Sequence, residues 1–312
     1  MTPRSGSGAL WHRSTAVWEQ QLCTAETGFE LRRRFCRRVD ALPARTEVAA
    51  DRLPDSSDSP VRWASPTLRD ETAVFTVRGS AQIAEQLWPE PGRFWTDRTG
   101  VEAFTELGRA LRQLHTEPPD FRLPTSTPHL ERLAAYLDDR CDTSGAATAV
   151  LTDLGADVVA VLRIWLRELP PADALGHGGL SLGSTFVDAD PTVHIDVVVG
   201  PELVRTTPAV DLGWIVGELM EFSYLRAIRG IPGDPYRRLA TAFTTGYRGS
   251  MEGPMDDEIV HRVALLRIVL HLCDYAETVR LNGDAGAHAH LAIYTPFVRG
   301  LVAHPDHREE GE

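Results

Sequence analysis

The chain of 312 residues contains no lysine, so the 32 residues counted as lysine or arginine are all arginine. Any phosphate group held by a permanently charged side chain must therefore be held by arginine. Basic residues are also outnumbered, because 32 of them face 44 acidic residues and leave a net charge of −12. Proteins that bind a nucleic-acid backbone need a basic surface, so the composition argues against nucleic acid as the main partner.

Long apolar runs are missing as well. No stretch approaches 18 consecutive apolar residues, which predicts that no helix spans a membrane and that no membrane is a partner. Residues 1–8 lack the apolar core of a signal peptide. The four cysteines are scattered and fit no metal-binding spacing, which predicts free thiols in a reducing compartment. We therefore expect a cytoplasmic protein.

Helical periodicity dominates the second half of the chain. Phe104, Leu107, Leu111 and Leu114 recur on one face of a helix predicted over Val101 to His115. Further helices are expected over 129–140, 146–168, 209–228, 235–248 and 256–281. Short strands are expected near 15–23, at 73–77 and at 193–195. The length suits two lobes around one cleft.

An arginine-rich segment follows residue 28. Its apolar residues recur at helical spacing and predict a helix over 29–42 that ends before Pro43. On such a helix Arg33 and Arg37 share one face, and Arg34 and Arg38 share another. These four arginines are our candidate docking site for an acidic peptide or a partner protein. A solvated helix surface without a partner predicts the same residues.

The stretch from Leu175 to Ser184 reads Leu-Gly-His-Gly-Gly-Leu-Ser-Leu-Gly-Ser, and Ile195-Asp196 and Asp211-Leu212 follow it. This order resembles the catalytic loop of the aminoglycoside phosphotransferase and choline kinase-like family, which has a protein-kinase-like fold. That family writes His-Gly-Asp-Leu-x-x-x-Asn, then Ile-Asp, then a later Asp-Leu. The chain keeps the outline of this motif but not all of its functional residues.

The resemblance implies an α+β, two-lobed fold. Residues 1–79 would form a small N-terminal lobe that combines a short sheet with the helix 29–42. This lobe would be truncated, because only about 28 residues precede that helix. Residues 80–303 would form a mainly helical C-terminal lobe that carries a degenerate catalytic loop at 175–196. Residues 304–312 are expected to be a flexible tail.

The family's roles transfer to this chain position by position. The catalytic base of the motif has become Gly179, and the amide that binds metal has become Ser184. Asp196 matches the remaining metal ligand, although a structural aspartate is equally consistent with the sequence. His177 and Asp211 match residues that brace the loop. An acid that stabilises a helix N-terminus would also explain Asp211.

Phosphoryl transfer needs a base, metal ligands and a cation that holds the phosphates. The chain lacks the first and part of the second, and only an arginine such as Arg13 is available for the third. We therefore predict a pseudokinase that does not turn over ATP efficiently, and we expect ATP and Mg²⁺ as cofactors only if the chain is an active enzyme. Divergent members of the family dehydrate Ser/Thr of ribosomal precursor peptides together with a lyase, as in lanthipeptide and thioamide-peptide pathways. The resemblance thus suggests a precursor peptide or a lyase-type protein as partner. The alternative is an active ATP-dependent phosphotransferase that acts on a hydroxyl of a small molecule or peptide, with Asp196 holding magnesium and a displaced base.

Overall fold

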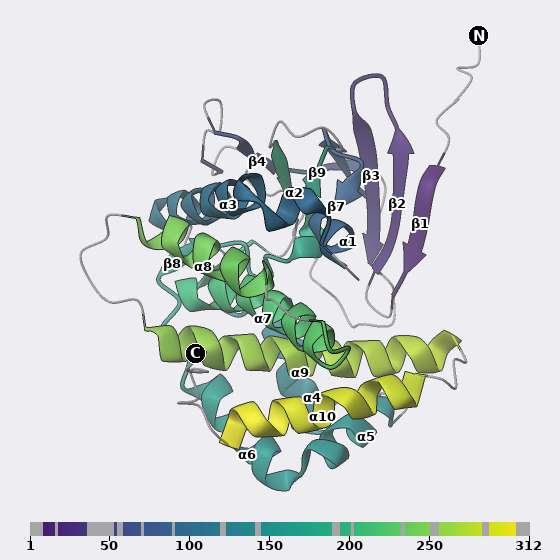
Figure 1. The fold of residues 1–312 in the computed structure, drawn as a ribbon, viewed down its shortest axis with the longest axis vertical. Helices are drawn as coiled ribbons and strands as arrows, with labels where there is room; N and C mark the ends of the chain where they lie inside the picture. The colour runs from purple at the N-terminus through teal and green to yellow at the C-terminus, as the bar shows by residue number, and fades with distance from the viewer. Residues whose placement is uncertain are drawn as a thin grey trace. The chain divides into compact units, whose positions relative to one another are not determined.

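The computed structural model describes thirteen stretches of the chain: 9–15, 18–35, 53–54, 59–69, 72–88, 91–118, 123–140, 145–188, 194–200, 203–231, 235–249, 256–282 and 287–303. Figure 1 shows the helices and strands of the chain. The chain divides into two compact units. Unit 1 comprises residues 1–117, 181–203 and 241–249, and unit 2 comprises 118–180, 204–240 and 250–312. The lobe boundary between residues 79 and 80 stays a prediction. The expected tail at 304–312 lies outside the described residues.

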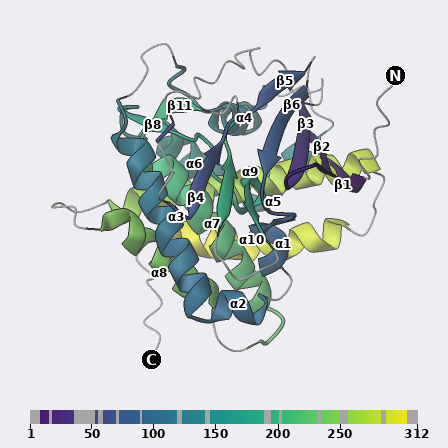
Figure 2. The ribbon, with the colours of Figure 1, turned by 90° about the horizontal axis from the view of Figure 1, so that it is seen from above.

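Unit 1 contains a five-stranded antiparallel sheet in the order β1-β2-β3-β6-β5, which Figure 2 shows from above. Its strands are β1 (Ala9–Ser14), β2 (Trp18–Thr24), β3 (Phe29–Phe35), β5 (Thr67–Arg69) and β6 (Thr72–Val77). Gly28 makes the turn between β2 and β3 with a φ of +86°, a conformation that favours glycine. The strands expected near 15–23 and at 73–77 are confirmed as β2 and β6.

The helix predicted over 29–42 is wrong for residues 29–35, which form strand β3. The apolar pair Leu31 and Phe35 fits a helical period, but it also fits the period of two of a strand. In the sheet Leu31 lies opposite Leu22 on one side and Phe75 on the other, and it is fully buried. These pairings from distant parts of the chain outweigh the local pattern. Residues 36–42 lie outside the described residues.

A second, four-stranded sheet has the order β4-β10-β9-β7. Its strands are β4 (Val61–Ala64), β7 (Ala81–Gln82), β9 (Thr185–Val187) and β10 (Ile195–Val198). Strand β10 runs parallel to β4 and antiparallel to β9. The strand expected at 193–195 lies further along the chain than predicted, since β10 begins at Ile195 and ends at Val198.

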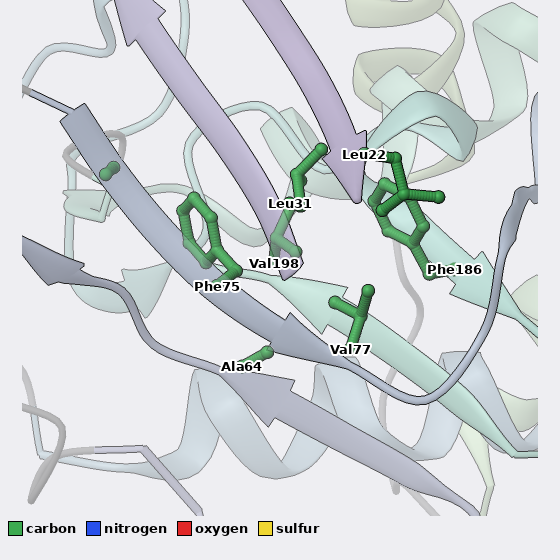
Figure 3. Packing of buried hydrophobic residues seen from close by; sticks show 8 residues of the cluster. Leu22, Leu31, Ala64, Phe75, Val77, Phe186 and Val198 are labelled. Atoms are coloured by element: carbon green, nitrogen blue, oxygen red, sulfur yellow. The ribbon is translucent and has the colours of Figure 1, made fainter. Parts of the chain in front are cut away.

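The two sheets of unit 1 share one hydrophobic core (Figure 3). Phe186 of β9 and Val198 of β10 belong to the same buried cluster as residues of the first sheet. The other members are Leu22, Leu31, Ala64, Ala73, Phe75 and Val77. Burying a side chain of this size stabilises the folded state by about 1.5–3 kcal/mol. The strands after the catalytic-like loop are therefore held by the N-terminal sheet.

Helices cover the remainder of unit 1. They are α1 (Ile83–Leu87), α2 (Arg93–Thr96), α3 (Arg98–Thr116) and the C-terminal half of α8 (Pro235–Arg248). Helices α3 and α8 approach closely, because a Cβ atom at Gly108 would lie 2.1 Å from the carbonyl oxygen of Phe243. Gly246 makes the reciprocal approach to the backbone of Thr105. The helix predicted over 101–115 is confirmed as part of α3.

Unit 2 is mainly helical. Its elements are α4 (Pro128–Leu137), α5 (Ala146–Leu154), α6 (Ala156–Arg167), β8 (Ala174–Gly176), β11 (Val204–Thr206), α7 (Pro208–Ala227), α9 (Asp257–Asn282) and α10 (Ala287–Ala303). The single helix predicted over 146–168 is two helices, because Gly155 breaks it with a φ of +90°. Within the described residues no helix is both long and apolar enough to cross a membrane.

Candidate functional site

Asp211 holds the start of the catalytic-like loop in unit 2. This fully buried carboxylate lies in the first turn of α7 and accepts hydrogen bonds from the backbone N–H groups of His177 (2.7 Å) and Gly178 (2.8 Å). Gly178 has a φ of +80°, so the loop needs glycine there. His177 is buried, with 1% of its surface exposed. Asp211 therefore fixes the start of the loop that follows β8, and a bracing role for the His177 side chain stays a prediction.

The imidazole of His129 fills the space at Gly179. A Cβ atom at Gly179 would lie 2.4 Å from Cδ2 and 2.5 Å from Nε2 of His129, well inside any normal contact distance. His129 enters from the first turn of α4, and its ring lies 5.7 Å from the ring of Trp214 on α7. No side chain fits at position 179 unless His129 moves. The imidazole of His129 thus occupies the position that the resemblance assigns to the catalytic base.

A chain of polar contacts orients His129. Arg132 places Nη2 at 3.3 Å from Nδ1 of His129 and forms a bidentate pair with Asp274 at 2.9 and 2.7 Å. Because a guanidinium group can only donate, Nδ1 is the accepting nitrogen in this contact. The proton of the neutral imidazole then lies on Nε2, the nitrogen closest to Gly179. His129 therefore presents a donor where the family's carboxylate would accept a proton.

Ser184 uses its hydroxyl within its own turn in unit 1. The hydroxyl donates to the carbonyl oxygen of Ser181 (2.7 Å) and accepts from the Ser181 N–H (3.0 Å). The hydroxyl of Ser181 in turn accepts from the Ser184 N–H (3.1 Å). These bonds close the 3₁₀ turn Leu182–Ser184, and Ser184 is 4% exposed. Both roles of the hydroxyl are thus taken by the backbone.

Asp196 lies inside strand β10 and is 1% exposed. Its Oδ1 accepts from Nε of Arg62 and Nε of Arg78, both at 2.9 Å, and lies 2.8 Å from Nη2 of Arg78. Its Oδ2 accepts from Nη2 of Arg62 (3.0 Å) and from the backbone N–H of Arg78. Both oxygens are therefore occupied by protein donors.

Magnesium does not fit the side chains that the resemblance assigns to it. The ion requires oxygen ligands in near-ideal octahedral geometry. The lone pairs of Asp196 point at guanidinium N–H groups, and two positive charges beside that carboxylate repel a cation. The Ser184 hydroxyl is bound by Ser181. Metal ligation by Asp196 stays a prediction that this arrangement disfavours.

Arg13, the candidate phosphate cation, is tied to the segment after β6. It lies in β1, donates to Oε1 of Gln82 (2.9 Å) and pairs with Glu85 on α1. Gln82 in turn donates from Nε2 to the carbonyl oxygen of Gly183 (2.7 Å). Burial lowers the pKa of the Arg13 guanidinium. Arg13 therefore links the edge strand to the loop.

Arg33 and Arg34, two of the four predicted docking arginines, do not lie on a helix, because β3 is a strand. Neighbouring residues of a strand point to opposite sides, so Arg33 and Arg34 are separated by the sheet. Arg33 is 5% exposed and lies over the rings of Trp18 (4.7 Å) and Phe75 (5.8 Å). Arg34 is exposed and pairs with Glu19. Arg37 and Arg38 lie outside the described residues.

Sequence reasoning missed His129, Arg62 and Arg78. Arg62 reaches Asp196 because β4 pairs with β10 in a parallel register that places the two residues side by side. Arg78 reaches it from the end of β6. Both contacts join residues more than a hundred positions apart. His129 is preceded by a helix start signal, Thr127-Pro128, but nothing local indicates its contact with Gly179.

No protein-family model and no curated protein sequence matches the chain. Solved structures do match. A microcompartment-associated aminopropanol kinase has a TM-score of 0.56 at 16% identity, over 96% of this chain and 92% of that one. A thermostable mutant of the aminoglycoside phosphotransferase APH(4)-Ia, bound to ADP and hygromycin B, has a TM-score of 0.54 at 9% identity, over 97% and 95%. This chain has the kinase-like fold of aminoglycoside phosphotransferases. The predicted α+β, two-lobed fold class is confirmed.

An aminoglycoside phosphotransferase complex with GDP and kanamycin agrees, with a TM-score of 0.53 at 10% identity over 98% of this chain and 95% of that one. At sequence identities this low, the structural similarity to phosphotransferases shows the fold alone. The functional positions must therefore be judged from the contacts of this chain's own residues.

Proposed function

We propose that this phosphotransferase-like chain is a pseudokinase that binds a peptide or a partner protein and does not transfer phosphate. The observation that carries the proposal is the enclosure of Asp196 by Arg62 and Arg78. Two guanidinium groups neutralise the carboxylate that an active relative would offer to magnesium. A metal that bridges and neutralises the phosphates is required for phosphoryl transfer in this fold.

Position 179 supports the same proposal. Glycine cannot accept a proton, and the imidazole that fills its place is oriented by Arg132 with its accepting nitrogen turned away. General acid–base catalysis typically contributes 10²–10⁴-fold to a rate. The chain thus keeps the brace formed by Asp211 while the groups around it no longer suit proton abstraction.

The proposed partner rests on the resemblance of the loop to the aminoglycoside phosphotransferase family, some divergent members of which act in natural-product pathways. We propose a precursor peptide or a lyase-type enzyme of a bacterial ribosomal-peptide pathway that dehydrates Ser/Thr, with the cytoplasm as the place of action. The exposed arginine of β3, Arg34, remains available as part of a docking surface, although Glu19 neutralises it in the free protein. Arg33 is better explained as part of the sheet packing.

A transfer assay tests the proposal. The purified chain is mixed with γ-labelled ATP, Mg²⁺ and the peptides and proteins encoded beside its gene, and both binding and label transfer are measured. We expect a complex with one of these partners and no label transfer above that of the Asp196→Ala variant. Transfer that Asp196→Ala abolishes would establish the active phosphotransferase instead. Failure to bind any partner would remove the binding role.

A further inference from the structure

Arg62 and Arg78 form a fixed pair of guanidinium groups at the surface of unit 1. Their Nε atoms each lie 2.9 Å from the same oxygen of Asp196, so the two groups are immediate neighbours. Arg62 is held further by the carbonyl oxygen of Thr76 (3.0 Å), and Arg78 contacts the carbonyl oxygen of Ile195 (3.4 Å). Each guanidinium group is thus anchored on one edge by a buried acceptor.

Each guanidinium group also keeps N–H donors that do not bond to Asp196. Each of the two side chains is 37% exposed, whereas Asp196 is 1% exposed. The side chains of Arg62 and Arg78 bond through Nε and Nη2, and neither Nη1 group bonds to another residue that the structure describes. The Nη1 groups can therefore bind a ligand without breaking the bonds to Asp196.

The charges do not balance. One arginine would neutralise Asp196, and two leave a local charge of +1 in a chain whose net charge is −12. A guanidinium group matches the geometry of phosphate, and its bonds to an anion are about twice as strong as neutral ones. Holding both groups in place beforehand reduces the entropy cost of binding. The excess positive charge, the match to phosphate geometry and the fixed position of the two groups are together what a site that binds an oxyanion needs.

We propose that Arg62 and Arg78 form a binding site for a phosphoryl group that operates without a divalent cation. The arginines supply the positive charge that magnesium supplies in an active kinase, and Asp196 serves as their anchor. The phosphoryl group belongs to a nucleotide or to a phosphorylated serine of a peptide, because both present the same dianionic oxygens. The site stands on its own geometry, whether or not the pseudokinase proposal holds.

Calorimetric titration with inorganic phosphate in EDTA tests the site, with potassium chloride at equal ionic strength as the salt control. We expect the wild-type protein to bind phosphate. The affinity should be about tenfold weaker in Arg62→Lys and in Arg78→Lys, because lysine keeps the charge but lacks the paired N–H donors of a guanidinium group. The matched control is Arg98→Lys, whose side chain is 90% exposed and pairs with Glu102. It should bind phosphate as the wild type does.

The absence of binding beyond the chloride control would overturn the proposal, as would an equal loss of affinity in Arg98→Lys. If the lysine variants do not fold, the NMR signals of the arginine Nε–H groups in the wild-type protein test the site. Phosphate must then shift the signals of Arg62 and Arg78 and leave that of Arg98 in place, and any other pattern rejects the site. Parallel titrations with ADP and with O-phosphoserine in EDTA identify the source, which is the compound that binds more tightly than phosphate.

Discussion

A single residue, Gly179, records how this chain departs from a phosphate-transferring loop. The family's motif has a carboxylate at this position, whereas this chain has glycine, and His129 occupies the volume that a side chain would need. The two residues depend on each other. The position of His129 requires glycine at 179, and glycine at 179 leaves a gap that His129 fills. The pair is therefore expected to behave as one unit in mutagenesis.

The first prediction concerns this pair. Gly179→Ala should lower the free energy of unfolding by about 1–3 kcal/mol, because the new methyl group would overlap the imidazole. The cost should shrink by more than about 0.5 kcal/mol when His129→Ala is present. Urea denaturation of the two single variants and the double variant measures both quantities.

Gly183→Ala is the matched control, since a Cβ atom there meets only Oγ of Ser181 at an ordinary 3.7 Å. It should change stability far less than Gly179→Ala does. Strictly additive costs for Gly179→Ala and His129→Ala would contradict the contact between these two residues.

The second prediction concerns Asp196. Asp196→Asn should destabilise the protein by about 3 kcal/mol in EDTA, because it leaves two arginines around a neutral group in a buried place. Glu102→Gln is the control, as its exposed pair with Arg98 is worth less than about 1 kcal/mol. Chemical denaturation compares the two. A residue that served only as a metal ligand would give no such loss in EDTA, so an unchanged stability would refute the anchoring role.

At the level of elements, most helices and strand β2 could be predicted, whereas strands β1 and β3 could not. Amphipathic segments such as α3 and α8 carry their period over several turns, so the pattern alone identifies them. Strand β3 has seven residues and carries arginines on both faces. Its identity depends on β2 and β6, which supply its partners from elsewhere in the chain. The contact between Arg62 and Asp196 could not be predicted for the same reason, because it joins two strands that are far apart in the sequence.

The third prediction tests strand β3 directly. Arg33→Ala should destabilise the protein by about 2 kcal/mol, since it removes a buried stem and a cation–π contact with Trp18. Arg34→Ala should cost less than about 1 kcal/mol, because its pair with Glu19 is exposed. Thermal or urea denaturation of both variants measures the difference. Equal and small effects would fit an exposed arginine helix and reject the strand.

At the level of the whole molecule, we expect acid stability to depend on a buried cluster in unit 2. Glu221 is 2% exposed and pairs with Arg267 and with His271, while Arg267 also binds Glu218 at 2.8 Å. Burial acts to raise the pKa of Glu221, but the charges of His271 and Arg267 outweigh it and lower that pKa to about 2. The same acids raise the pKa of Arg267 against the effect of its burial.

The fourth prediction follows from the sign of this shift. The folded-state pKa of Glu221 lies below its unfolded value of about 4.3, so its stabilisation is complete above that value. As the pH falls from about 4.5 to about 2, the free energy of unfolding should drop by on the order of 3 kcal/mol. Glu221→Gln should be less stable at pH 7 and should flatten this part of the pH profile. A Glu221→Gln profile as steep as that of the wild type would contradict the assignment.

The central claim is that two arginines have replaced the metal at Asp196, and the magnesium dependence of nucleotide binding tests it most directly. Isothermal titration of ATP into the wild-type protein is carried out once with Mg²⁺ and once with EDTA. The account predicts that magnesium does not tighten the binding of ATP. Binding that is at least tenfold tighter with magnesium, and that Asp196→Ala abolishes, would contradict it.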